Sequence, residues 1–280
     1  MAAIALAFCA STCWGVADFF GGLKSRSLPV LTVLLTIEAA GLVVIAVAVA
    51  AAGGPVPSVG AVAAAMGAGC AGIFGLAAFY RALAIGTMSI VAPISAVGLA
   101  LPVIVGLTSG DQPSAVQGAG LACAAIGVVL ASREPGHEED VRRASRQSIV
   151  LALVAAVGFG SYFVGADRAA DEGVLWTLLF SRVAATPIIA LVVMARRDPL
   201  VPPRRDLWQL AAIGIVDLSA TGLYAWATTK GLLSIVAVVG SLYPIATVVL
   251  ARLLLAERIA RGQAIGVGAA LTGVALLAAG

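Results

Sequence analysis

Charged residues are scarce in this chain: they make up 11% of its 280 residues, while 61% are hydrophobic and the mean hydropathy is +1.07. Soluble domains carry roughly 25% charged residues, so a soluble fold of this size could not hide so much apolar surface. The charges fall in short clusters between apolar stretches of about 19–24 residues, the length that crosses a roughly 30 Å hydrocarbon core as a helix. The composition therefore predicts a membrane protein.

The chain also has only one histidine and no residue spacing typical of metal ligands. The single histidine, His137, lies in a polar loop, which excludes a catalytic or metal-binding histidine cluster. The four cysteines lie inside apolar stretches without metal-ligand spacing, so we expect no disulfide, metal or cofactor. A net charge of +3 with scattered basic residues argues against a nucleic-acid partner. The N-terminus lacks a basic segment before its apolar run, so we expect no cleaved signal peptide.

Alternation of polar and apolar residues, which would indicate a membrane β-barrel, is absent from runs such as Ile37 to Ala52. The predicted class is therefore all-α, a polytopic membrane protein. Windows between charge and Gly/Pro clusters predict ten transmembrane helices near 2–22, 29–52, 60–80, 86–108, 114–132, 148–166, 174–195, 206–228, 232–252 and 262–279.

One long polar segment, residues 133–147, divides the chain into two halves, 1–132 and 148–280, with five predicted spans each. Gly86 to Ala92 recurs as Gly231 to Ala237, and the Gln, Gly, Gly and Val of 117–128 recur with the same spacing at 263–274. Trp14-Gly15 aligns with Phe159-Gly160 in the same order. These matches predict an internal duplication. An odd number of spans in each half makes the repeats inverted.

Lysine and arginine positions predict the orientation. Thirteen of these residues fall in the loops after odd-numbered spans, and only Arg168 and Lys230 fall in the alternate loops. Basic loops favour the cytoplasm, so both termini are predicted to lie outside.

A family resemblance follows from several of these motifs. Ser241 to Pro244, Ala256 to Arg258 and Gln263, together with Trp14-Gly15 and Tyr80 to Ala84 of the first half, resemble the EamA-type permeases of the drug/metabolite transporter (DMT) superfamily. The resemblance implies ten helices around a central cavity, and passive or proton-linked movement of metabolites, amino acids or drugs. One departure is Ser109-Gly110-Asp111-Gln112, where the family usually has Gly-Glu-Arg.

Ionisable side chains inside a span cost at least about 2.5–3.5 kcal/mol, so each needs a partner, an aqueous cavity or a function. Four qualify: Asp18, Glu38, Arg182 and Asp217. In the repeat register Glu38 lies within one position of the equivalent of Arg182, so the two could form an ion pair that only holds spans two and seven. Asp217 is a second candidate for a coupling or solute-binding acid, with a hydrogen bond to a neighbouring hydroxyl such as Ser219 or Thr221 as the alternative.

Asp18 lies close to Trp14 and is the first candidate for proton coupling, with a helix-end carboxylate as the alternative. Glu257 is expected to be a helix cap or surface charge. Trp14 and Tyr243 are the aromatic candidates for a solute cavity, against an interfacial belt. Pro93, Pro102 and Pro244 lie in equivalent spans four and nine, where kinks would serve gating or be static.

These observations predict a plasma-membrane secondary transporter that moves a small solute by alternating access. Its expected partners are the lipid bilayer and the solute, and a homodimer is compatible with this plan. Two other classes stay open: a non-transporting membrane subunit, and an intramembrane enzyme. The enzyme would need a polar catalytic cluster, and the sequence has no Ser/His/Asp set or nucleotide loop.

Overall fold

The computed structural model describes residues 1–25, 27–85, 94–95, 97–131, 146–255 and 261–280. These residues form helices and no strands, which confirms the all-α class for the described part of the chain. The first half contains α1 (Ala2–Ser25), α2 (Val30–Ala52), α3 (Val59–Ile85), the 3-10 helix η1 (Val97–Leu99), α5 (Ala100–Thr108) and α6 (Ala115–Ala131). The second half contains α8 (Arg146–Ala170), α9 (Val174–Arg196), α10 (Arg204–Thr228), α11 (Leu233–Gly240), α12 (Tyr243–Leu255) and α13 (Arg261–Ala279).

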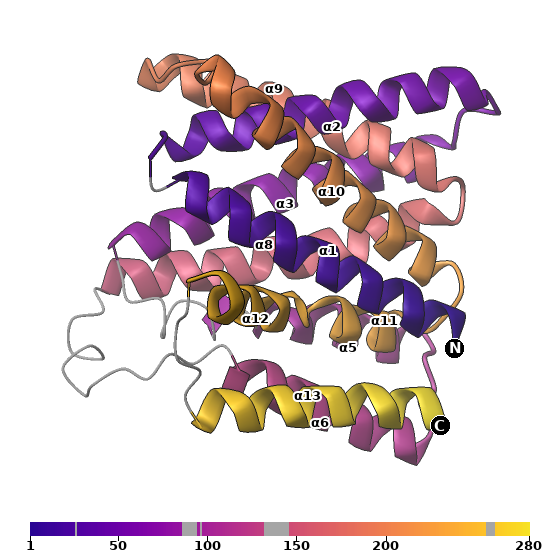
Figure 1. The fold of residues 1–280 in the computed structure, drawn as a ribbon. Coiled ribbons are helices and arrows are strands. Elements are labelled where there is room, and N and C mark those ends of the chain that lie inside the picture. Colours follow the sequence, from indigo (N-terminus) through magenta and orange to yellow (C-terminus); the bar gives the residue numbers. More distant parts are fainter. Residues whose placement is uncertain (26, 86–93, 96, 132–145, 256–260) are drawn as a thin grey trace.

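Six of these helices are long and apolar enough to cross a membrane: α1, α2, α3, α8, α9 and α10. Shorter apolar stretches lie in α6 (Ala115–Gly127) and α13 (Ala264–Leu277). The long helices extend between the two ends of the bundle at different tilts, and both chain ends lie at the same end (Figure 1). Large apolar side chains such as Val47, Leu191 and Leu253 are more than 60% exposed, as suits contact with lipid.

The predicted ninth span is not one continuous helix. α11 ends at Gly240 and α12 begins at Tyr243, so the apolar run 232–252 hides a break that hydropathy cannot detect. Pro244 is the second residue of α12 and Pro102 the third residue of α5. Proline is tolerated at the start of α12 because the first N–H groups of a helix have no intrahelical acceptor. Pro244 therefore stands at a helix start, whereas Pro102 lies just after the junction at which η1 continues into α5. Pro93 lies outside the described residues, and a gating role for these prolines stays a prediction.

Small residues bring α6 and α13 into close contact. Gly127 lies against the backbone of Ala270, and a Cβ added at Gly273 would lie 2.5 Å from the backbone nitrogen of Ala124. Close backbone approach at glycine and alanine is the usual way in which helices associate without a hydrophobic driving force. α6 and α13 also lie side by side in Figure 1.

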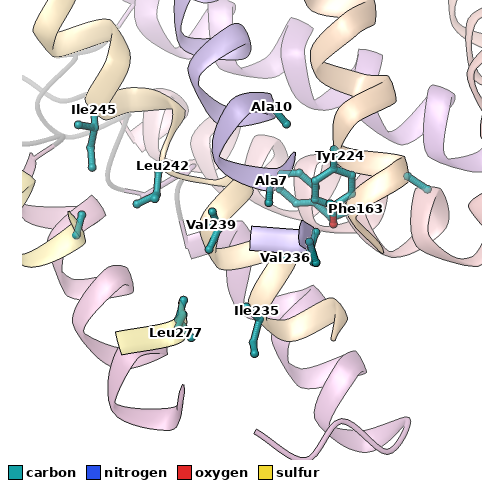
Figure 2. Close-up of a cluster of buried hydrophobic side chains, with 14 residues drawn as sticks. Ala7, Ala10, Phe163, Tyr224, Ile235, Val236, Val239, Leu242, Ile245 and Leu277 are labelled. Carbon is teal, nitrogen blue, oxygen red and sulfur yellow. The ribbon is translucent and has the colours of Figure 1, made fainter. Parts of the chain in front are cut away.

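The largest apolar cluster joins the two halves of the chain. Ala7 and Ala10 of α1 meet Phe163 of α8, Tyr224 of α10 and Val236 of α11 (Figure 2). The rings of Phe163 and Tyr224 have centroids 4.8 Å apart. The packing of these buried side chains holds α1, α8 and α10 together across the two halves of the chain.

Candidate functional site

A cavity of about 130 Å³ lies between the halves. Its lining comes from α1, α2 and α3 of the first half and from α8, α9, α10 and α12 of the second. The lining residues are Trp14, Asp18, Glu38, Gly69, Gly72, Ile73, Leu76, Phe79, Phe159, Tyr162, Phe163, Ser181, Arg182, Ala185, Asp217, Thr221 and Tyr243.

All six side chains that the sequence singled out for solute binding or coupling line this one cavity: Trp14, Asp18, Glu38, Arg182, Asp217 and Tyr243. They come from five different helices that are up to 229 positions apart in the chain, counted from Trp14 to Tyr243. The structure thus brings the predicted residues together, and their role toward a solute stays a prediction.

Arg182 is the centre of a charged triad. Its Nη1 atom lies 2.6 Å from Oε1 of Glu38, and its Nη2 atom donates a hydrogen bond to Oδ2 of Asp217. The predicted pair between Glu38 and Arg182 is therefore present. The arginine side chain is 5% exposed, and such a buried cation is tolerated because two carboxylates compensate it. Gly41 of α2 leaves room beside the guanidinium, since a Cβ there would lie 3.4 Å from Cζ of Arg182.

The neighbouring hydroxyls of Thr221 and Ser219 donate to backbone carbonyls and not to the carboxylate of Asp217. Thr221 donates its hydroxyl to the backbone carbonyl of Asp217, and Ser219 donates to the carbonyl of Ile215. The carboxylate of Asp217 pairs with Arg182 instead. Sequence reasoning missed this second contact because it depends on how α9 and α10 are rotated about their axes.

Asp18 differs from the other two acids of the cavity. It is half-buried, seven residues before the end of α1 at Ser25, and so lies inside the helix rather than at its end. Within the described residues, no lysine or arginine forms an ion pair with it. The cavity therefore holds one carboxylate without a cationic partner among the described residues.

The wall beside the acids is aromatic. The ring of Trp14 has its centroid 6.1 Å from that of Tyr162, 5.9 Å from that of Phe163 and 5.6 Å from that of Tyr224. Phe79 and Phe159 form another ring pair in the lining, with centroids 5.8 Å apart. The sequence did not indicate these phenylalanines as cavity residues, because a ring that faces a cavity and one that faces lipid look alike in hydropathy.

Three further hydrogen-bonded contacts tie the two halves together at the ends of the bundle. Asp111 belongs to the segment 109–112, which differs from the usual Gly-Glu-Arg of the family. Its carboxylate accepts hydrogen bonds from the backbone nitrogen (2.8 Å) and the hydroxyl (2.7 Å) of Ser234, in the first turn of α11. An anionic cap at a helix N-terminus is favourable because the free N–H groups there carry partial positive charge. At the other end of the bundle, Lys24 forms an ion pair with Asp206 at 2.7 Å.

The third contact joins Glu172, between α8 and α9, to Ser58, before α3. The Ser58 hydroxyl donates to one carboxylate oxygen at 2.7 Å, and its backbone N–H donates to the other at 2.6 Å. The two hydrogen bonds stabilise the ionised carboxylate and lower the pKa of Glu172. Glu257, which the sequence predicts to be a helix cap or a surface charge, lies outside the described residues.

Taken together, the apolar helices, the lipid-facing side chains and the buried charged cavity define a multi-pass membrane protein. Comparison with known proteins identifies a family for the second half of the chain. Residues 146–279 match the EamA-like transporter family, which is part of the DMT superfamily, so the resemblance in the sequence is confirmed and this half of the chain is an EamA-like domain.

A solved crystal structure, one of several matching chains, shares the fold with a TM-score of 0.76 and 19% sequence identity, over 98% of this chain and 95% of that chain. At this identity the likeness shows the fold alone. No curated protein matches the sequence.

Proposed function

We propose that this chain is a secondary transporter of the plasma membrane, with ten spans arranged as two inverted five-helix repeats over residues 1–132 and 148–280, joined by 133–147. A small metabolite, amino acid or drug-like solute crosses by alternating access, and Asp18 couples the movement to protons. The observation that carries the proposal is the cavity between the halves. Its wall holds three carboxylates and a guanidinium at the depth of membrane-spanning helices, where such groups typically mark a solute or ion pathway.

The packing pattern supports the repeats. If α1, α2, α3 and α6 are exchanged with α8, α9, α10 and α13, each main helix contact maps onto another observed contact. The pair α1 and α10 becomes α8 and α3, and the pair α2 and α10 becomes α9 and α3. The pairs α2 with α9 and α6 with α13 map onto themselves. A pseudo-twofold axis would produce this pattern.

Individual residues in α6 and α13 follow the same exchange. Gly127 lies against Ala270 and Gly273 against Ala124, and a shift of 146 residues converts the first contact into the second. The Cys123 thiol donates to the carbonyl of Ala269 at 3.2 Å, and these two residues are themselves 146 apart. We expect the axis to pass through this crossing.

The orientation can be tested by labelling. Both termini lie at one end of the bundle (Figure 1), and Lys24 and Arg196 lie in the last turns of α1 and α9. We propose that the end with these basic residues faces the cytoplasm. Single cysteines placed at Arg196 and at Asp171 in a cysteine-free variant would report the two ends. We expect an impermeant thiol reagent to label intact cells at position 171 and not at 196. The reverse pattern would overturn the orientation and leave the transporter proposal standing.

Transport can be tested in proteoliposomes with a broad panel of solutes, with and without an imposed pH gradient. We expect gradient-driven accumulation of at least one solute by the native protein. Asp18→Asn should abolish the gradient response and leave solute exchange measurable, whereas Asp171→Asn, an exposed acid outside the cavity, should behave as native. An equal gradient response in all three proteins would exclude proton coupling through Asp18. No flux and no stabilisation by any solute would favour a non-transporting subunit.

A further inference from the structure

The charges that line the cavity do not balance. Asp18, Glu38 and Asp217 supply three carboxylates against the one guanidinium of Arg182, and the described lining contains no lysine or histidine. A net negative charge away from bulk water is unfavourable unless a cation approaches it. The cavity is therefore better suited to a cationic occupant than to an anionic one.

Arg182 is not free to bind an anion. Both ends of its guanidinium are engaged, Nη1 by Glu38 and Nη2 by Asp217, and its side chain is 5% exposed. An anionic solute would have to displace a buried carboxylate from it. Asp18 is half-buried and is left without a lysine or arginine partner among the described residues, so it can accept a cation without breaking an existing ion pair.

The walls next to Asp18 add a second preference. Trp14 lies one helical turn before Asp18 on α1, and Tyr162, Phe163 and Tyr243 line the same space. The faces of aromatic rings attract organic cations, most strongly those of tryptophan. The volume of about 130 Å³ is close to the roughly 150 Å³ of an apolar cavity that holds one benzene molecule. The space fits one ring or a short branched chain.

We propose, resting on the transporter function above, that the solute is a small organic cation whose charged group contacts Asp18 and whose apolar part lies against Trp14 and the neighbouring rings. The Glu38–Arg182–Asp217 triad lines the same cavity and excludes anions through its two carboxylates. Asp18 then binds either a proton or the cation, which is the condition for exchanging one for the other.

Three probes of nearly equal shape separate charge from size: benzylamine, which is a cation at pH 7, benzyl alcohol, which is neutral, and benzoate, which is an anion. Binding to purified full-length protein in detergent is measured by thermal shift and by isothermal titration. We expect benzylamine to bind at least tenfold more tightly than benzyl alcohol, and benzoate to show no binding. A hydrogen bond to a charged partner is worth about a tenfold to hundredfold change in Kd, so Asp18→Asn should weaken benzylamine binding by about that factor.

Matched variants keep the test decisive. Asp18→Glu retains the carboxylate and should bind benzylamine within a few-fold of the native protein, and Asp171→Asn should bind as native. Equal binding of benzylamine and benzyl alcohol, or tighter binding of benzoate, would overturn the cationic class. Unchanged benzylamine binding in Asp18→Asn would overturn the role of Asp18. If benzylamine fails while another solute of the broad panel is transported, only the cationic class falls; if no solute binds or moves, the transporter proposal fails with it.

Discussion

The two halves of the chain place different chemistry at matching positions of the same cavity. A shift of 145 residues aligns Trp14 with Phe159, and a shift of 144 aligns Glu38 with Arg182. Each of these four side chains lines the cavity. At the shift of 145, Glu38 and Arg182 lie within one position of equivalence in the proposed repeats, so their ion pair would lie close to the axis that relates the halves.

The acids show the difference most clearly. At the shift of 145, Asp18 aligns with Phe163 and Asp217 aligns with Gly72. Each acid of the cavity therefore has an uncharged residue at the equivalent position of the other half. The halves resemble each other in helix order and close contacts, which concern shape. They differ in the groups that a solute would touch. We infer that the shared shape serves the movement between conformations, while the unequal side chains determine selectivity.

The largest expected effect comes from removing the shared cation of the triad. Arg182→Met would leave the buried Glu38 and the half-buried Asp217 without a cationic partner, and removal of one member of a buried ion pair typically costs about 3–5 kcal/mol. We expect a clearly lower melting temperature in detergent, or loss of folded protein. Glu38→Gln should cost less, because Arg182 keeps its contact with Asp217.

Arg196→Met is the matched control, since this arginine is exposed at the end of α9. We expect it to melt within the error of the native protein. If Arg182→Met melts like Arg196→Met, the triad does not hold α2, α9 and α10 together. The ion pair between the two halves would then not contribute to stability.

The sequence predicted the pair of Glu38 and Arg182 because a charge inside a span must be compensated and few groups are available to do so. It predicted most helix ends to within a few residues, because charged clusters mark where apolar runs stop. The break before Tyr243 and the second contact of Arg182 were not predictable in this way. Both depend on the position and rotation of neighbouring helices, which hydropathy along one segment does not report.

Pro187 is a further feature that sequence reasoning missed. It lies inside α9, five residues after Arg182, where it cannot donate the usual helix hydrogen bond. The apolar run 174–195 gave no sign of it as a special position, because a proline in a membrane helix is tolerated when neighbouring helices pack around it.

A smaller effect is expected at the crossing of α6 and α13, where the proposed repeats predict that equivalent substitutions in the two halves have equal effects on stability. Gly127→Ala and Gly273→Ala each force a Cβ against the backbone of the facing helix, and overpacking of this kind costs about 1–3 kcal/mol. We expect the two variants to lower the melting temperature by similar amounts. Gly118→Ala and Gly268→Ala, on the same two helices with no atom within 4 Å of the added Cβ, should be neutral or slightly stabilising. A large effect at only one of Gly127 and Gly273 would show that the crossing is not symmetric.

The smallest expected effect is the pH dependence of the tie between Glu172 and Ser58, which links the loop after α8 to the start of α3. Because the folded-state pKa of Glu172 is below its ordinary value of 4.5, its stabilisation is fully present above about pH 4.5 and is lost as the pH falls through the folded-state pKa. Glu172→Gln cannot accept both hydrogen bonds, so it should melt slightly below the native protein at pH 7. We expect that difference to shrink as the pH is lowered toward 4, measured as melting temperature in a detergent stable over this range.

Ser58→Ala should show the same small loss and the same pH trend, while the neighbouring Asp171→Asn should show neither. A difference between native protein and Glu172→Gln that stays constant from pH 7 to 4 would mean that the carboxylate charge does not stabilise this end of the bundle.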